Sequence, residues 1–490
     1  MSGSGTANQP GKLRPPIALL GVPFDSLTMA EAVTRIEHMI QSHRPQYVVT
    51  ANMDFLVQAR QDVELRKILF DADLVLCDGT PLVWASRLLG NPLPERVAGS
   101  DLVPELLALA AQRGYRVFFL GATPEAAQIA TEKMIARYPG LIIAGHYSPP
   151  FNHLLEMNHD QIQERVRQAN PDLLFVSFGC PKQEKWIGMH FRTLGVPVTI
   201  GVGATIDFLA GRVRRAPHWM QRSGTEWLFR LLQEPRRLFN RYAKDLGVFS
   251  VSFLAQWWRL GRFRTGPLLP WPPAPEDRSR FPARLTYPII RAHLNQFFAT
   301  AGYSVLDLRH VERIDSTGTA LLMRLQRQAD HALHELTWLG PSRPVAQALR
   351  TMRLQDFFLF APDAQSALQV RSHLSRQRAR PVRRLAASRS QLAWEGEITA
   401  LNAPAVWVAT RDHFLASPAG QPWILDLANV RFMDSSGLST VVRAKKLALS
   451  FGTDLKLTGV QGPVRNVFRL ARLEAFLLNG HRAGEGSVYP

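Results

Sequence analysis

The chain has 490 residues, which is too long for one ordinary hydrophobic core, so we expect at least two domains. Its 46% hydrophobic and 20% charged residues are typical of a globular protein. The two cysteines, Cys77 and Cys180, exclude a disulfide framework and a cysteine-rich zinc site. No signal-peptide pattern opens the chain, and the Gly/Ser/Pro-rich residues 1–16 predict a disordered N-terminus in a cytoplasmic protein.

The net charge of +18 is concentrated in two segments. Residues 209–264 contain twelve Lys/Arg and three acids, and residues 364–394 contain seven Arg and no acid. Charge gathered in this way favours an anionic partner, such as a membrane surface, nucleic acid or an acidic protein. The alternative for each segment is a solvated surface.

Residues 17–210 alternate short apolar runs with helical periodicity. The runs "IALLGV", "YVVT", "LVLC", "VFFLGA", "LIIAG", "LLFVSFG" and "VTIGVG" predict strands, and Thr28-x-x-Glu31 has the spacing of a capping box before a helix. Apolar strands that alternate with helices predict a doubly wound, mostly parallel Rossmann-like sheet.

Polar residues and glycines follow several of these strands. Thr50 and Asn52 follow one strand, Asp78 and Gly79 follow the next, and Gly121, Gly179, Gly201 and Gly203 close three later ones. In a doubly wound sheet, ligands bind beyond the carboxyl ends of the strands, and glycine turns before helices bind phosphate. We therefore expect an anionic ligand at this edge.

Several common enzyme classes lack their motifs. "GVGATI" has Ile206 where a dinucleotide fingerprint needs its last glycine, and the chain has no GKS or GKT phosphate loop. No G-x-S-x-G elbow is present. The sequence thus gives no support for hydride transfer, P-loop chemistry, serine hydrolysis or zinc catalysis.

Over about residues 17–245 the chain resembles the WecG/TagA/CpsF glycosyltransferases. The resemblance rests on "TAN", "DADLVLCDGTPLVWASRLLG", "ERVAGSDL", "VFFLGATPEAA", "PDLLFVSFGCPKQEKWI", "GVGATIDFLAGRVRRAPHWM" and "GTEWLFRLLQEPRR", in the same order. It implies an inverting transfer of an N-acetylmannosamine-type sugar from a UDP-sugar to polyprenyl-diphosphate-linked GlcNAc. It also implies that no metal or other cofactor is required.

The resemblance gives roles to individual residues. Asp78 would be the catalytic base, Thr50 and Asn52 would contact sugar or acceptor, and Arg96 would neutralise the diphosphate. Gly79 would let the substrate approach the backbone, and the UDP would be held by Gly121, Gly179, Lys182 and Gln183. The alternatives are that Asp78 caps a turn, Asn52 caps a helix and Arg96 is structural. We expect Glu184 and Lys185 to be charges on a helix surface.

Residues 211–265 predict a basic appendage that associates with a membrane. The thirteen uncharged residues 246–258 are too few to span a bilayer but suit an interfacial anchor, with Trp257 and Trp258 among the headgroups. The alternative is an amphipathic helix packed on the sheet. By resemblance, Arg214, Arg215 and Arg230 would help to bind the diphosphate, and the protein would be peripheral on the cytoplasmic face of the inner membrane.

A Pro-rich linker, residues 266–283, precedes an internal repeat. "LDLRHVERIDSTGTALLMRLQ" at 306–326 aligns without a gap on "LDLANVRFMDSSGLSTVVRAK" at 425–445, an offset of 119 residues. We expect two small α/β domains, at 284–370 and 392–482, joined by an Arg-rich linker, 371–391; the first domain lacks a clear leading strand.

Both copies resemble STAS domains, the fold of anti-sigma-factor antagonists. The resemblance makes Ser316 and Ser435 candidate phosphosites and implies a protein partner or a serine kinase; the alternative is that each Asp-Ser pair only caps a helix.

Three functions remain open from the sequence. The first is a peripheral glycosyltransferase regulated by its STAS domains, and the second is an inactive scaffold that acts through them. The third, nucleic-acid binding, has the charge but lacks a recognisable motif, so no nucleic acid is expected. The oligomeric state is left open.

Overall fold

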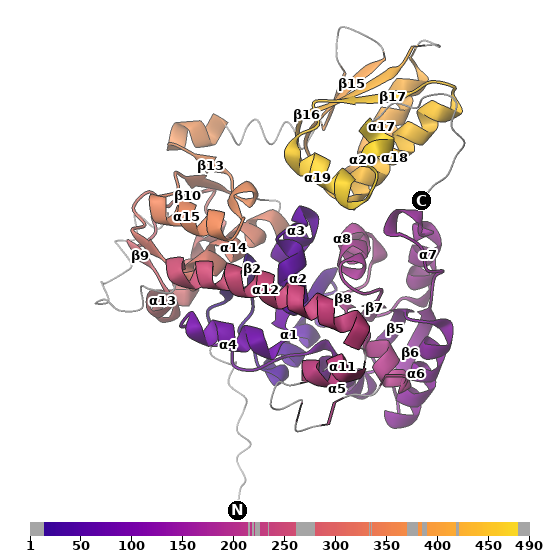
Figure 1. Ribbon diagram of the computed structural model, residues 1–490, viewed down its shortest axis with the longest axis vertical. Helices are drawn as coiled ribbons and strands as arrows, with labels where there is room; N and C mark the ends of the chain where they lie inside the picture. The colour runs from indigo at the N-terminus through magenta and orange to yellow at the C-terminus, as the bar shows by residue number, and fades with distance from the viewer. Residues whose placement is uncertain are drawn as a thin grey trace, which may run out of the picture.

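The computed structural model describes residues 14–213, 216–217, 220, 226–233, 235–260, 280–332, 334, 336–369, 381–384, 390–417 and 421–478. Figure 1 shows an N-terminal α/β domain, a small α/β unit beside it that contains the first repeat, and a second small unit that contains the second repeat. The long helix α12 (Pro235–Leu260) lies across the N-terminal domain and reaches the first repeat.

The N-terminal domain is built on a six-stranded parallel sheet with the order β4-β3-β8-β7-β5-β6. Its strands are β3 (Gln46–Ala51), β4 (Leu74–Cys77), β5 (Arg116–Gly121), β6 (Ile142–Tyr147), β7 (Leu173–Ser177) and β8 (Val198–Gly201). The central strands are apolar and buried on both faces, which is why they contain runs of Val, Ile, Leu and Phe. The predicted doubly wound, mostly parallel sheet is confirmed.

Helices cover both faces of this sheet. One face packs against α1 (Met29–Gln41), α5 (Gly99–Arg113), α6 (Pro124–Arg137) and α9 (Thr205–Ala210). The other packs against α2 (Met53–Ala59), α3 (Val63–Asp71), α4 (Thr80–Leu88), α7 (His159–Ala169), α8 (Lys182–Leu194) and part of α12, with a short turn η1 (Leu154–Glu156) before α7. Successive strand residues enter opposite cores, as Val48 and Val49 do. Thr28 and Glu31 form the predicted capping box of α1.

The first predicted strand lies outside the sheet. Residues 17–22 turn back at Leu20 and Gly21, so that β1 (Ile17–Leu19) pairs with β2 (Val22–Phe24) in an antiparallel hairpin. Gly21 has a φ of 91°, and a Cβ there would lie 2.5 Å from the carbonyl oxygen of Met352 in the first repeat. The close approach of another segment therefore needs glycine at this turn, and the hairpin packs against the first repeat.

The two repeats have equivalent elements. The first contains β9 (Arg284–Leu285), α13 (Tyr287–Ala299), η3 (Thr300–Gly302), β10 (Val305–Asp307), β11 (Arg313–Ile314), α14 (Ser316–His331), β12 (Thr337–Leu339), α15 (Arg343–Thr351), η4 (Gln355–Phe357) and β13 (Phe360–Ala361). The second contains β14 (Val382–Arg384), β15 (Gln391–Ile398), α17 (Ala403–Leu415), β16 (Trp423–Met433), α18 (Ser435–Ser450), β17 (Leu455–Thr458), α19 (Gly462–Leu470) and α20 (Glu474–Leu478).

The main difference between the copies is the leading strand. In the second repeat β15 has eight residues, whereas β9, which pairs with the equivalent part of the first repeat, has two. Both α14 and α18 begin with an Asp whose carboxylate accepts two backbone N–H groups of the first turn. Most of the predicted linkers, 266–279, 371–380 and 385–389, lie outside the described residues.

Helix α12 is packed along part of its length. Phe249 and Phe253 enter the core of the N-terminal domain, and Leu260 enters the core of the first repeat. Gln256 is fully buried; its amide donates to Ala18 O and Ser316 Oγ, at 2.8 and 2.9 Å, and accepts from Leu20 N. The predicted alternative of a packed amphipathic helix therefore describes this face of α12.

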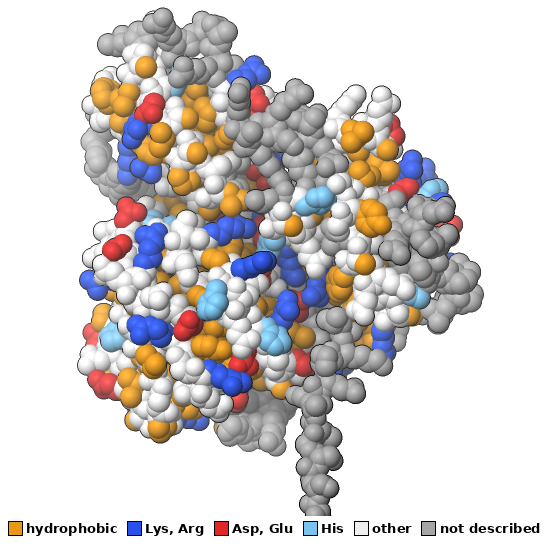
Figure 2. Space-filling view, turned by 180° about the vertical axis from the view of Figure 1, so that it is seen from behind, with side chains coloured by type: hydrophobic (Ala, Val, Ile, Leu, Met, Phe, Trp, Pro, Cys, Tyr) orange, Lys and Arg blue, Asp and Glu red, His pale blue; other side chains and the backbone are white. Residues whose placement is uncertain are grey.

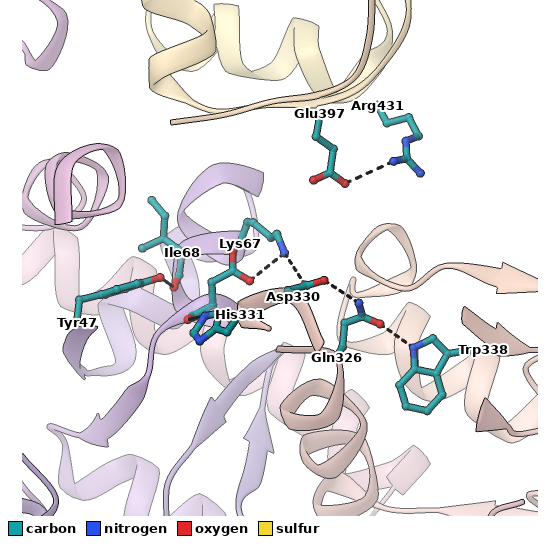
Figure 3. Close-up of polar contacts among 10 residues, drawn as sticks. Tyr47, Lys67, Ile68, Gln326, Asp330, His331, Trp338, Glu397 and Arg431 are labelled. Carbon is teal, nitrogen blue, oxygen red and sulfur yellow. Dashed lines mark hydrogen bonds and ion pairs between the residues drawn. The ribbon is translucent and has the colours of Figure 1, made fainter. Parts of the chain in front are cut away.

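Charged side chains hold the first repeat against the N-terminal domain. Lys67 of α3 pairs with Asp71 at 2.9 Å and with Asp330 of α14 at 3.5 Å, and Asp330 accepts from Gln326 (Figure 3). Burial lowers the pKa of Lys67, but Asp71 and Asp330 outweigh it and raise that pKa above its ordinary value. Lys67 is therefore a charged residue at the junction.

Replacing Gln256 with Leu should destabilise the protein by about 2–4 kcal/mol, because buried polar groups of the hairpin and of α14 would lose their partner. The free energy of unfolding, measured in urea, tests this. Gln128→Leu on the exposed surface of α6 is the control and should change stability by less than about 0.5 kcal/mol. Equal effects of the two substitutions would contradict the assigned role of Gln256.

Candidate active site

The strand register places the predicted residues at one edge of the sheet. Ala51 at the end of β3 pairs with Cys77 at the end of β4, and Gly121 at the end of β5 pairs with Ser177 at the end of β7. Polar residues that follow these strands thus lie at the same edge of the sheet, beyond which a doubly wound topology has its ligand crevice.

Asp78 and Arg96 form the charged centre of this crevice. Asp78 follows β4, is partly buried, and donates its backbone N–H to Ala51 O at 2.9 Å. The Arg96 guanidinium donates to Asp101 at 2.7 Å and to Glu226 at 3.0 Å. Burial lowers the pKa of Arg96, but the charges of Asp78, Asp101 and Glu226 raise it overall. One arginine therefore lies among three carboxylates.

Glu226 and Asp101 were not among the site residues predicted from the sequence. Both lie inside motifs that carry the resemblance, "GTEWLF" and "AGSDL", but neither follows a strand. Glu226 begins α11 (Glu226–Gln233), so its contact with Arg96 brings the basic appendage to the edge of the crevice. That pairing depends on the tertiary arrangement and has no local signal.

Thr50, Asn52 and Gly79 have defined local roles. The Thr50 hydroxyl is buried and donates to Gly201 O at 3.3 Å. Asn52 caps α2, since its side-chain oxygen accepts from Asp54 N and Phe55 N; this is the predicted alternative for Asn52. Gly79 has an extended backbone that any residue adopts, and a Cβ there would meet Asn52 and Leu82 at ordinary van der Waals distances of 3.8 Å, so neither its conformation nor its surroundings require glycine.

The turns at Gly121 and Gly179 differ in the space around each glycine. Gly121 has a φ of 104°, and a Cβ there would lie 2.4 Å from Ser177 O, so no other residue fits between β5 and β7. Gly179 has a φ of 79° and open space around it, and α8 begins shortly afterwards at Lys182. Its surroundings thus leave room for a ligand before the N-terminus of α8.

Gln183 joins two of these turns. Its side-chain oxygen accepts from Gly179 N and Gly203 N, both at 3.1 Å, and its amide donates to Glu184 at 2.7 Å. Because Gln183 is 2% exposed, its contacts are internal, whereas the sequence predicted a direct contact with UDP. Lys182 is half-buried and donates to Asn152 O at 2.6 Å.

Glu184 is buried and Lys185 is partly buried, with 14% of its side chain exposed, so the prediction of surface charges was wrong. Glu184 is 1% exposed, and burial raises the pKa of its carboxyl to about 7, although the hydrogen bond from Gln183 opposes that shift. Lys185 pairs with Asp62 at 2.7 Å and with Glu64 at 2.9 Å, both at the start of α3. The helical position of these residues was predictable, but their burial under α3 was not.

The remaining predicted residues either lie in the two repeats or are outside the described residues. Arg214 and Arg215 are outside the described residues, as is the side chain of Arg230. Ser316 and Ser435 are 1% and 5% exposed. Gln256 donates to Ser316, and the Ser435 hydroxyl donates to Glu64 at 2.9 Å, so both candidate phosphosites are buried in contacts with the rest of the chain.

The fold and the crevice define a doubly wound α/β protein with a carboxylate and an arginine at the carboxyl edge of its sheet. Residues 17–263 match the model of the glycosyl transferase WecG/TagA/CpsF family, and the chain belongs to that family. Residues 382–479 match the model described as Mlab, STAS domain. We therefore call the N-terminal part the transferase domain and the second repeat the STAS domain.

Curated relatives from Staphylococcus aureus share the transferase domain. The proteins of strains MW2 and COL, both named N-acetylglucosaminyldiphosphoundecaprenol N-acetyl-beta-D-mannosaminyltransferase, are each 32% identical to this chain over 238 residues. Each alignment covers 48% of this chain and 92% of the relative.

Among the described residues, no helix is both long enough and apolar enough to cross a bilayer.

Glu184→Gln should make stability less dependent on pH. Because the folded-state pKa of Glu184 is raised from 4.5 to about 7, its favourable contribution is complete below pH 4.5 and is lost as the pH rises through 7. Relative to the variant, the wild type should lose about 3 kcal/mol between pH 4.5 and pH 8.

Unfolding in urea at several pH values measures this difference. Glu164→Gln, at an exposed position of α7, is the control and should follow the wild type. Parallel stability curves for wild type and Glu184→Gln would show that Glu184 titrates normally.

Proposed function

We propose that the transferase domain moves an N-acetylmannosamine-type sugar from a UDP-sugar to a polyprenyl-diphosphate-linked GlcNAc acceptor. The observation that carries the proposal is the position of Asp78 beside Arg96 at the carboxyl edge of the sheet, within the residues that match the family model. The names of the S. aureus relatives support the sugar and the class of acceptor.

The proposed reaction is one displacement at the anomeric carbon. Asp78 takes the proton of the acceptor hydroxyl as that oxygen forms its bond to the sugar. The bond between the anomeric carbon and the UDP oxygen breaks, and UDP leaves with the bonding electrons. This step inverts the configuration.

Arg96 would stabilise the negative charge that develops on the diphosphate. In the structure its guanidinium is held by Asp101 and Glu226. A diphosphate would compete with Glu226 for it, so the appendage would respond to a bound donor. With an arginine in this role, we propose that the reaction needs no metal.

The appendage would bring the site to its lipid-linked acceptor on the cytoplasmic face of the membrane. Its exposed surface is rich in apolar side chains, among them Leu232, Phe239, Val251, Leu254 and Trp258. Arg236, Arg241, Lys244 and Arg259 lie on the same helix, α12, or at its ends, and would attract anionic lipid.

The STAS domain would regulate the transferase through α3 and α8. The Ser435 hydroxyl and backbone N–H both donate to Glu64, and Glu64 pairs with Lys185 of α8. The same helix carries Gln183, which joins the turns at Gly179 and Gly203. Loss of the Ser435 contact would therefore act on the helix that follows the proposed donor-binding turn.

Asp78→Asn should lower acceptor-dependent UDP release by about 10²–10⁴-fold, because the amide cannot take the acceptor proton. The assay uses UDP-N-acetylmannosamine and a short-chain lipid-diphosphate-GlcNAc, with and without EDTA. Asp160→Asn on the exposed surface of α7 is the control and should keep wild-type activity.

The outcomes separate the two open functions. Acceptor-dependent release that survives EDTA and collapses in Asp78→Asn supports the transferase mechanism. If Asp78→Asn retained activity, Asp78 would be a residue that caps a turn and not the catalytic base. A wild type that is silent with this and related UDP-sugars on liposomes would favour the scaffold function.

Ser435→Asp should separate the STAS domain from the transferase domain, because it places a second carboxylate against Glu64 in a buried site. Small-angle X-ray scattering should then report a larger radius of gyration than for wild type. Ser435→Ala removes the hydroxyl without adding charge and should remain compact. An unchanged radius for Ser435→Asp would mean that this contact does not hold the domain.

A further inference from the structure

A cleft lined by arginines lies where the transferase domain, the first repeat and the STAS domain meet. Its volume is about 680 Å³, and its lining includes Arg60 and Arg66 of the transferase domain, Arg353 of the first repeat and Arg469 of the STAS domain. None of the described residues that line it is acidic. A volume of this size lies within the range of small-molecule sites in proteins.

The arginines of the cleft are held close together by the backbone. The Arg66 guanidinium donates to Ala59 O, Arg60 O and Arg353 O at 2.8–2.9 Å, and Arg353 also donates to Arg60 O. These bonds fix the positions of two guanidinium groups, those of Arg66 and Arg353, but bring no negative charge to them. Arg60 and Arg469 make no side-chain hydrogen bond or ion pair with the described residues.

Burial, together with the crowding of like charges, lowers the pKa values of two of these arginines. Burial and the neighbouring charges of Arg353 and Arg60 lower the pKa of Arg66 to about 10, although Asp356 and Asp62 oppose the shift. Burial and Arg353 lower the pKa of Arg60 as well. Asp62 is already paired with Lys185, so the nearby acids only partly balance the cluster.

Amide side chains complete the lining. Gln61, Gln355 and Asn466 come from the same three parts of the chain, and Asn466 donates to Gln61 O at 3.4 Å. The side-chain oxygen of Asn466 is buried and has no hydrogen-bond partner among the described residues. A ligand that carried both anionic groups and hydrogen-bond donors would satisfy this lining.

A neighbouring recess extends the basic surface. It shares Arg469 and adds Arg465 and Arg472, of which Arg465 pairs with Glu474 at 2.6 Å. On the back of the molecule, Figure 2 shows several Lys and Arg side chains grouped near the middle of the face.

We propose that the cleft between Arg60, Arg353 and Arg469 binds a soluble phosphorylated small molecule, of nucleotide size, with at least two phosphate groups. Guanidinium groups recognise phosphate with paired hydrogen bonds, and several of them together favour a multiply charged ligand. Because the lining comes from three parts of the chain, the ligand binds the assembled arrangement and stabilises it. This site is separate from the crevice at Asp78 and does not depend on the proposed reaction.

Inorganic pyrophosphate is the probe, titrated calorimetrically into the full-length protein. The test variant is Arg60→Ala/Arg469→Ala, which leaves the backbone carbonyl of Arg60 in place. Wild type should bind pyrophosphate. The variant should either not bind it or bind it with a Kd that is higher by about tenfold or more. Pyrophosphate should also raise the unfolding temperature of the wild type more than that of the variant.

The control variant is Arg137→Ala/Arg411→Ala, which removes the same charge from an exposed position of the transferase domain and a partly exposed position of the STAS domain. It should bind pyrophosphate as wild type does. Identical isotherms for wild type and Arg60→Ala/Arg469→Ala would overturn the proposal, as would the absence of wild-type binding at about 10 mM pyrophosphate.

Vesicles containing phosphatidylglycerol test whether the arginines of the cleft bind a lipid headgroup instead of a soluble anion. Arg60→Ala/Arg469→Ala should bind such vesicles as wild type does. If this variant lost vesicle binding and kept pyrophosphate binding, the arginines would serve a membrane surface and the proposed soluble ligand would be wrong.

Discussion

The short helix α3 carries the buried charges on which the assembly of the protein depends. Within about one turn it presents Glu64 to the STAS domain, the guanidinium of Arg66 to the loop after α15, and Lys67 to Asp330 of the first repeat. A buried charge that loses its partner costs about 3–5 kcal/mol, so each of these pairings selects one arrangement of the domains over others. The transferase domain and the two repeats are thus joined by specific electrostatic contacts as well as by linkers.

The same helix connects that assembly to the candidate active site. Asp62 and Glu64 hold Lys185 of α8, and α8 begins after the glycine turn that closes β7. Gln183, two residues before Lys185, joins this glycine turn to the one that follows β8. A change at the STAS interface therefore has a short, continuous path of packed and hydrogen-bonded groups to the carboxyl edge of the sheet.

The two repeats use the same structural feature for different contacts. In each, an Asp caps the long helix, and the serine after it points into the rest of the protein. Ser316 meets an amide, Gln256, in a neutral contact, whereas Ser435 meets the carboxylate of Glu64. In the second contact, Asp434 and Glu64 lie close together, and burial, followed by the charge of Glu64, raises the pKa of Asp434 to about 7. The STAS interface is therefore the more sensitive of the two to added negative charge.

The sequence by itself determined the parallel sheet, the repeat and the residues at the strand ends, because these depend on local periodicity and on the order of short motifs. It placed Asp78 and Thr50 at one edge, Arg96 came from the family resemblance, and the cap formed by Asn52 was one of its two alternatives. Only the tertiary structure decided that residues 17–24 form a hairpin, that Glu184 is buried and Lys185 partly so, and that Glu226 pairs with Arg96. The hairpin turn at Gly21 packs against Met352, and the other contacts likewise join segments that are distant in the chain. The packing that brings such segments together leaves no periodic signal in either one.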